Sequence, residues 1–144
     1  MFFSSPLAPG TPAPDFELPD DQGNQVRLSA LRGQNVVLVF YPADETPVCR
    51  RQLCEFRDRA ELRGQKNAAV FGVNPGSLAS HAGFRERQNL GFPLLVDEGG
   101  KVAKQYNCKS LWIRRTVYVI GKDGTIRFAS RGKPTVEEVL AAAE

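Results

Sequence analysis

Two cysteines five residues apart, Cys49 and Cys54, are the residues whose types and spacing suit redox chemistry. An ionised thiol is a nucleophile that attacks peroxide bonds, and a second thiol can capture the oxidised sulfur as a disulfide. In an intact α-helix, positions i and i+5 have Cα atoms roughly 8–9 Å apart, whereas a disulfide needs less than about 7 Å. The two cysteines would therefore pair only after the helix unwinds. The spacing alone leaves open the alternative of two buried, inert thiols on one helix.

A strand, a loop and a helix are predicted to position Cys49. Residues 35–41 are β-branched, apolar or aromatic almost throughout, which favours a central strand buried on both faces. Pro42 ends this strand, and a helical pattern then runs from about residue 48 to about residue 63. Cys49 is thus expected in the first turn of a helix, where free N–H groups and the helix dipole stabilise a thiolate. Catalytic groups in α/β sheets favour such carboxyl ends of strands.

The rest of the chain alternates between short apolar runs and helical patterns. Strands are expected at 16–18, 25–28, 68–73, 93–96, 115–120 and 125–129, and helices at 30–32, 78–89, 101–106 and from 134 to about 143. Ser77 is expected to cap the helix at 78–89. This alternation predicts an α/β domain with a mixed sheet. No repeat or change in composition marks a second domain, so residues 1–144 are interpreted as one domain.

Composition disfavours several classes of protein. The net charge is +3, from 19 basic and 16 acidic residues without a long basic run, so nucleic-acid binding is not expected. The longest apolar run, residues 36–41, is too short to span a bilayer. Residues 1–14 are rich in proline and lack a basic segment followed by an apolar one, so no secretory signal is predicted. Three cysteines also argue against a disulfide-stapled secreted scaffold, and a cytoplasmic location is expected.

Other reactive residue types give weaker hypotheses. Cys108 is expected on a loop near the site as a structural or unreactive thiol, with a role as a second resolving partner as the alternative. His81, the only histidine, is expected to be solvated on a surface helix, which disfavours a Cys–His hydrolase. The spacing of Cys49 and Cys54 does not fit a zinc knuckle, and Cys-x-x-Cys and phosphate-binding glycine loops are lacking. No metal and no organic cofactor are expected.

The segment around the two cysteines resembles the peroxiredoxin active-site motif P-x-x-x-T-x-x-C. The residues that carry the resemblance are Phe40-Tyr41-Pro42, Asp44, Thr46-Pro47, Cys49, Cys54 and Phe56-Arg57-Asp58. The chain is most similar to the Q-type branch, also called bacterioferritin comigratory proteins, in which a second cysteine follows the first by five residues. The likeness continues through Ala13-Pro14-Asp15-Phe16, Gly72-Val73-Asn74, residues 91–97 and residues 115–120, and so covers nearly the whole chain.

The resemblance implies a role for each of five residues. Cys49 matches the peroxidatic cysteine and Cys54 the resolving cysteine. Pro42 matches the proline that shields the thiolate from solvent, and Thr46 the hydroxyl residue that hydrogen-bonds the thiolate and the peroxide. Arg115, rather than its neighbour at 114, matches the arginine that holds the thiolate and polarises the peroxide. A thiolate, a hydroxyl and a guanidinium can together align the O–O bond and stabilise charge on the leaving oxygen.

The resemblance also implies a fold and a reaction cycle. The fold is a thioredoxin-like one, with a central mixed sheet flanked by helices and an N-terminal extension. The activity is reduction of hydrogen peroxide and organic hydroperoxides through a sulfenic acid at Cys49 and an intramolecular Cys49–Cys54 disulfide, which thioredoxin or a similar dithiol reduces. Intramolecular resolution needs no second subunit, so a monomer is expected. Val48 and Arg50 replace the family's common Gly and Thr, which is expected to alter access and local charge. The alternative from another class is a redox sensor or chaperone-like protein on the same fold.

Overall fold

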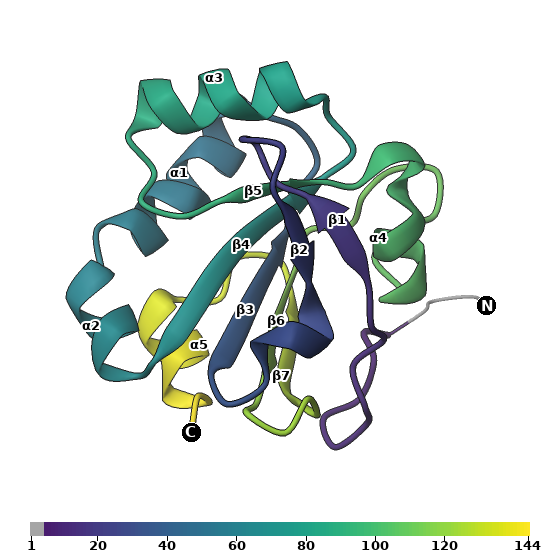
Figure 1. Cartoon of the computed structure of the whole chain (residues 1–144), viewed down its shortest axis with the longest axis vertical. Helices are drawn as coiled ribbons and strands as arrows, with labels where there is room; N and C mark the ends of the chain where they lie inside the picture. Colours follow the sequence, from purple (N-terminus) through teal and green to yellow (C-terminus); the bar gives the residue numbers. More distant parts are fainter. Residues whose placement is uncertain (1–4) are drawn as a thin grey trace.

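The computed structural model describes residues 5–144 and contains a five-stranded mixed sheet of order β5-β4-β3-β6-β7 (Figure 1). Its parallel part is formed by β3 (Asn35–Phe40), β4 (Ala68–Asn74) and β5 (Leu94–Val96); β6 (Thr116–Ile120) and β7 (Ile126–Arg131) are antiparallel additions. A separate hairpin pairs β1 (Glu17–Pro19) with β2 (Gln25–Arg27). Residues 1–4, part of the proline-rich N-terminal segment, lie outside the described residues.

Helices connect the strands as the sequence patterns predict. They are η1 (Leu28–Leu31), α1 (Pro47–Arg57), α2 (Ala60–Gln65), α3 (Leu78–Gln88), η2 (Glu98–Gly100), α4 (Lys101–Gln105) and α5 (Val136–Ala141). Ser77 caps α3 as expected, because its Oγ accepts the N–H of Ser80 at 3.1 Å. The single helix expected over residues 48–63 is wrong, since Arg59 leaves the helical region (φ −116°, ψ 38°) and separates α1 from α2. No helix of residues 5–144 is long and apolar enough to cross a membrane.

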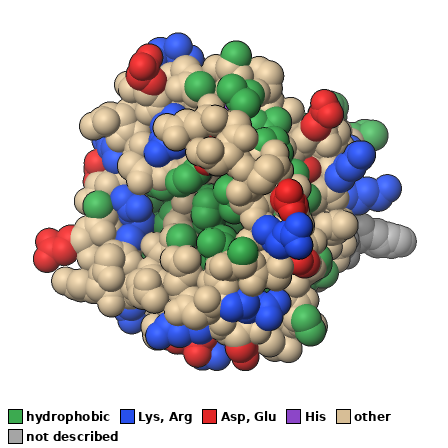
Figure 2. Space-filling view, viewed as in Figure 1, with side chains coloured by type: hydrophobic (Ala, Val, Ile, Leu, Met, Phe, Trp, Pro, Cys, Tyr) green, Lys and Arg blue, Asp and Glu red, His purple; other side chains and the backbone are tan. Residues whose placement is uncertain are grey.

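The central strand β3 is buried on both faces, which confirms the interpretation of its continuous apolar run. Alternate side chains of a strand point to opposite faces. Val36, Leu38 and Phe40 therefore pack in one cluster with the hairpin and α4, whereas Val37 and Val39 pack in a second cluster with α1, α3 and α5. Figure 2 shows hydrophobic side chains gathered in a hollow beside the hairpin. The two clusters define two faces of the sheet, one covered by the hairpin and α4 and the other by helices α1, α3 and α5.

One edge of the sheet brings together segments that are distant in the sequence. The carboxyl ends of the parallel strands β3 and β4 meet there, and β6 begins there because it runs antiparallel to β3. The register pairs Phe40 with Thr116, so the next residues, Tyr41 and Arg115, also lie side by side. Because side chains alternate along a strand, Arg115 is directed to the face that α1 covers. This register sets the position of the candidate site.

Candidate active site

Cys49 is the third residue of α1 and is 1% exposed. The first hydrogen bond of the helix runs from the N–H of Arg50 to the carbonyl of Thr46 at 2.8 Å, so the N–H groups of Val48 and Cys49 precede the helical ladder. Thr46 is the N-cap residue, but its side chain makes no capping bond. The thiol therefore lies at the positive end of the helix dipole, which is an environment that stabilises an anion.

Arg115 lies beside the sulfur of Cys49. Its Nη2 donates to Cys49 Sγ at 3.2 Å, and its Nη1 donates to Gln52 Oε1 at 2.8 Å. Gln52 is 1% exposed and also donates from Nε2 to the carbonyl of Gly132 at 3.3 Å. The N–H of Gly132 in turn donates to the carbonyl of Arg115 at 2.8 Å. Gln52 thus holds the guanidinium of Arg115, and the loop after β7 holds the main chain of the same residue. The guanidinium presents its second Nη to the sulfur.

Sequence reasoning did not identify Gln52. A signal was available, because Gln52 follows Cys49 by three residues and so shares its helix face. Leu53 and Phe56 lie on the same buried side of α1. A polar side chain on an otherwise apolar helix face requires a buried partner, which here is Arg115.

Pro42 and Thr46 lie on the loop between β3 and α1, and both are exposed. The Thr46 hydroxyl donates to the carbonyl of Ala43 at 3.1 Å, and its bond to the sulfur remains a prediction. The Pro42 carbonyl accepts from Asn74 Nδ2 at 2.7 Å. Thr46 directly precedes α1 as its N-cap residue, and the proposed shielding of the sulfur by Pro42 likewise remains a prediction.

Cys54 is half-buried in the same helix, which is continuous from Pro47 to Arg57, and it is a free thiol like Cys49 and Cys108. Its Sγ lies 3.7 Å from Gln88 Oε1 of α3. Burial raises the pKa of the Cys54 thiol, and the nearby Arg57 guanidinium offsets this only in part. The structure therefore presents Cys54 as a protonated thiol, held apart from Cys49 by the intact helix.

Cys108 lies on a loop, as predicted, and its carbonyl accepts the N–H of Arg114 at 2.6 Å, but its side chain is on the other face of the sheet from Cys49. Cys108 is fully buried in the cluster beneath the hairpin and α4, whereas Cys49 belongs to the cluster on the opposite face of the sheet. Its Sγ lies 3.3 Å from the carbonyl of Tyr106, and burial raises the pKa of the thiol. The sheet separates Cys108 from the pair on α1.

The prediction that His81 is a solvated helix residue is also wrong. His81 is fully buried and its Nδ1 lies 2.7 Å from Asp44 Oδ2, in the loop that precedes α1. Phe84, three residues further along α3, is buried as well. The i, i+3 spacing of His81 and Phe84 was the available signal for a shared inward face. The partner was not predictable, because Asp44 is 37 residues away in the sequence.

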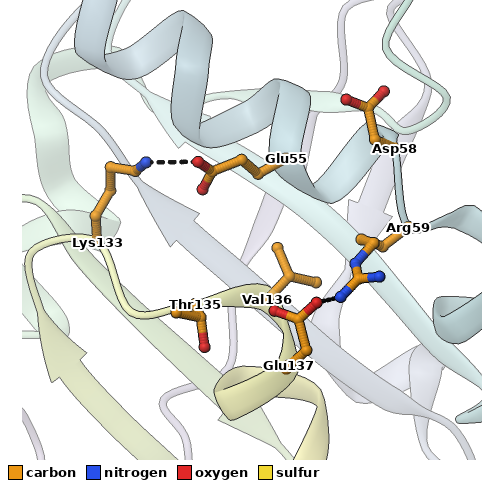
Figure 3. A pocket seen from close by; sticks show the side chains of 7 residues that line it. All are labelled: Glu55, Asp58, Arg59, Lys133, Thr135, Val136 and Glu137. Atoms are coloured by element: carbon orange, nitrogen blue, oxygen red, sulfur yellow. Dashed lines mark hydrogen bonds and ion pairs between the residues drawn. The ribbon is translucent and has the colours of Figure 1, made fainter.

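A pocket of about 410 Å³ lies between the carboxyl end of α1 and the start of α5 (Figure 3). Two ion pairs border it: Lys133 Nζ with Glu55 Oε2 at 2.8 Å, and Arg59 with Glu137. Its lining contains no cysteine, so we do not assign peroxide chemistry to it. Within residues 5–144 no group of three or more His, Cys, Asp or Glu side chains is arranged to hold a metal ion.

Known proteins similar to this chain support a family assignment. A family model described as "AhpC/TSA family" matches residues 9–129. The chain is 39% identical over 126 residues to "Peroxiredoxin Bcp" of Bacillus subtilis (strain 168), covering 81% of this chain and 80% of that protein. It is 40% identical over 126 residues to "Peroxiredoxin Q, chloroplastic" of Oryza sativa subsp. japonica, covering 85% of this chain. The match spans 58% of the length of that relative.

Solved structures of related proteins share the fold. "Peroxidoxin BcpB" from Mycobacterium tuberculosis matches with a TM-score of 0.88 and 33% identity, covering 94% of this chain and 95% of that chain. The bacterioferritin comigratory protein of Xanthomonas campestris matches with a TM-score of 0.85 and 26% identity, covering 94% and 97%. These likenesses confirm the predicted thioredoxin-like fold with its N-terminal extension. The chain belongs to the AhpC/TSA family of peroxiredoxins, and within it to the peroxiredoxin Q/Bcp subfamily.

Proposed function

We propose that this chain is a thiol peroxidase in which Cys49 reduces hydroperoxides and Cys54 resolves the oxidised sulfur. The observation that carries this proposal is the 3.2 Å contact between Arg115 Nη2 and Cys49 Sγ at the amino end of α1. A guanidinium and free helix N–H groups beside one sulfur stabilise the thiolate and can bind a peroxide oxygen next to it.

In the first step the Cys49 thiolate attacks one oxygen of the hydroperoxide. A sulfur–oxygen bond forms, the O–O bond breaks, and the leaving hydroxide or alkoxide takes up a proton to depart as water or an alcohol. The sulfur becomes a sulfenic acid. Arg115 stabilises the negative charge that grows on the leaving oxygen, and Gln52 keeps the guanidinium in position.

In the second step the Cys54 thiol attacks the sulfenic sulfur, a disulfide forms and water leaves. The Cα separation of the two positions in an intact helix, roughly 8–9 Å, exceeds what a disulfide spans, so this step requires α1 to unwind. Ion pairs of Glu55 with Lys133 and of Arg59 with Glu137 connect the carboxyl end of α1 to the loop after β7 and to α5. Because these pairs are largely exposed and individually weak, they do not prevent the unwinding.

The remaining components of the cycle are proposed from family membership. An external dithiol of the thioredoxin type reduces the disulfide by exchange. Organic hydroperoxides are included as substrates because the X. campestris structure is titled for its "Alkyl Peroxide Reduction Activity". A single subunit suffices, since both cysteines lie on one helix. A cytoplasmic location is proposed here too, although relatives are named chloroplastic.

The test is a non-reducing mass analysis of the reduced protein before and after one equivalent of hydrogen peroxide, with peptide mapping. We expect a loss of two hydrogens mapped to Cys49 and Cys54. Cys49→Ser should leave the peroxide unconsumed, whereas Cys54→Ser should consume a single equivalent and stop at the sulfenic acid. Cys108→Ser is the matched control and should behave as the unmodified protein, because that thiol lies on the other side of the sheet.

Two results would overturn the proposal. Full turnover by Cys49→Ser would show that another group attacks the peroxide. A disulfide that maps to Cys108 would require a rearrangement across the sheet and would remove the role assigned to Cys54. If this protein oxidises a partner protein much faster than it turns over peroxide, the result would instead support the redox-sensor alternative.

A further inference from the structure

A hydrogen-bond network, buried except at Ser80, connects the loop before α1 to helix α3. The carboxylate of Asp44 is 5% exposed and accepts three hydrogen bonds: from Tyr41 Oη at 2.6 Å, from Ser80 Oγ at 2.7 Å and from His81 Nδ1 at 2.7 Å. Asn74, at the end of β4, donates from Nδ2 to the carbonyls of Tyr41 and Pro42, each at 2.7 Å. We call Tyr41, Asp44, Asn74, Ser80 and His81 the loop clamp. In Figure 1, α3 lies across the top of the molecule, above the loop and α1.

The surroundings of His81 fix its protonation state. Its Nε2 lies 3.1 Å from the carbonyl oxygen of Asn74 and 3.0 Å from that of Leu95. Carbonyl oxygens only accept hydrogen bonds, so Nε2 carries a hydrogen. A neutral ring would then direct the lone pair of Nδ1 at a carboxylate oxygen 2.7 Å away, which is repulsive. A second proton must lie between the ring and Asp44.

That second proton belongs on the ring. The hydroxyls of Tyr41 and Ser80 both donate to Asp44, and such donors stabilise a carboxylate rather than a carboxylic acid. Burial by itself lowers the pKa of His81, but the hydrogen bond and charge of Asp44 and the two carbonyl acceptors outweigh it, and the pKa is raised. For Asp44, burial raises the pKa, and the hydrogen bonds from His81, Tyr41 and Ser80 lower it below its ordinary value.

The ionisable groups packed against the ring come from two elements. Asp44 belongs to the loop, and Tyr41, the residue directly after β3, has its ring centroid 6.4 Å from that of His81. Burial raises the pKa of Tyr41 well above its ordinary value, and the charge of Asp44 adds to this effect, so Tyr41 stays neutral. From β4 and β5 the ring receives the main-chain carbonyls of Asn74 and Leu95. The charge of the network is therefore set by the His81–Asp44 pair.

We propose that His81 is a positioning residue of the peroxidase site: as an imidazolium it holds Asp44, and through Asp44 the loop that sets the first turn of α1. The proposal rests on the proposed function. Removing one partner of a buried charge pair leaves the other unpaired, which disfavours the arrangement in which the loop is packed against α3. The clamp thus favours the form in which Cys49 meets Arg115 over the unwound form in which Cys54 reaches Cys49. A second contact, between Arg87 of α3 and Glu45 of the loop, acts in the same direction.

The test uses the fact that His81 is the only histidine of the chain. The nitrogen shifts of its ring, followed by NMR over pH, report its protonation in the reduced protein and in the Cys49–Cys54 disulfide form. Linkage requires that, if unwinding releases the clamp, the pKa of His81 differs between the two forms. We expect it to fall toward the ordinary value of 6.5 in the disulfide form. A histidine with a purely structural role would show the same pKa in both.

Kinetics of two variants provide the second readout. In His81→Gln the sulfenic acid should convert to the disulfide on the order of tenfold faster, and the reaction with peroxide should be slower by a similar factor. Asp44→Asn retains the shape of the His81–Asp44 pair but not its charge. It should change the two rates in the same directions as His81→Gln, and both rates should depend less on pH than in the unmodified protein. Glu86→Gln removes one charge from the exposed face of α3 and is the matched control with unchanged rates.

The outcomes separate this inference from the proposed function. If the unmodified protein forms no Cys49–Cys54 disulfide with peroxide, the proposed function fails. If the disulfide forms but His81 has the same pKa in both forms, and the variants keep the ratio of the two rates, the positioning role is wrong. The NMR measurement needs no substitution, so a variant that fails to fold does not block the test.

Discussion

Replacing Arg115 by glutamine measures how much the guanidinium contributes to the reaction of Cys49 with peroxide. The substitution removes the donor that lies 3.2 Å from Cys49 Sγ and the charge that faces the reacting oxygens. A hydrogen bond to a charged group contributes about 1.5–3 kcal/mol, and about 1.4 kcal/mol corresponds to a tenfold change in rate. Arg115→Gln should therefore lower the second-order rate constant for peroxide by about 10- to 150-fold.

The structure also predicts a variant with an intermediate effect on this rate constant and a control variant without one. Gln52→Leu removes the 2.8 Å hydrogen bond that orients the guanidinium but leaves the guanidinium able to reach the sulfur, so a smaller loss, of about fivefold, is expected. Arg114→Gln removes the same charge from the preceding, equally half-buried residue, whose side chain the alternation along the strand directs away from the face that α1 covers. Its rate constant should stay within about twofold of the unmodified protein. This comparison separates the contact with sulfur from a general effect of positive charge.

The rate constants are measured by competition with a peroxidase of known rate for limiting hydrogen peroxide. The far-ultraviolet circular dichroism of each variant checks that its fold is retained. If Arg115→Gln and Arg114→Gln lower the rate constant equally, the contact in the folded helix is not what promotes the reaction. The assignment of Arg115 would then have to be abandoned.

Two further predictions concern stability. A Cβ on Gly72 would lie 2.6 Å from Leu94 Cδ2 inside the core, so Gly72→Ala should lower the free energy of unfolding by about 1–3 kcal/mol in urea titration. Gly64→Ala in α2 meets open space and should instead be neutral or slightly stabilising; equal effects would refute the packing argument. The raised pKa of His81 predicts a contribution to stability that is full below pH about 6.5 and is lost as the pH rises through the folded-state pKa. His81→Gln should abolish that alkaline decline in pH-dependent unfolding curves, and an unchanged decline would assign it to another group.

Local sequence patterns predicted most of the elements. The continuous apolar run at 36–41 favours a strand buried on both faces, and residues 35–40 form β3. Ser77 offers a hydroxyl to free N–H groups, and α3 begins after it. The helix break at Arg59 escaped prediction, because the residues on both sides continue a helical pattern and nothing local requires the chain to turn.

The candidate site divides in the same way. The sequence by itself determined that Cys49 follows a central strand and opens a helix, because strand, proline and helix signals lie within a few residues of one another. No local pattern placed a group beside its sulfur: the resemblance to peroxiredoxins pointed to Arg115, and the tertiary structure brings it there. Arg115 reaches Cys49 across 66 positions because β6 pairs antiparallel with β3 in a register that matches Phe40 with Thr116. The burial of His81 likewise follows from the packing of α3 on the loop. A local pattern can indicate that a side chain faces inward, as the spacing of His81 and Phe84 does, but the group that it meets there depends on which distant segments pack together.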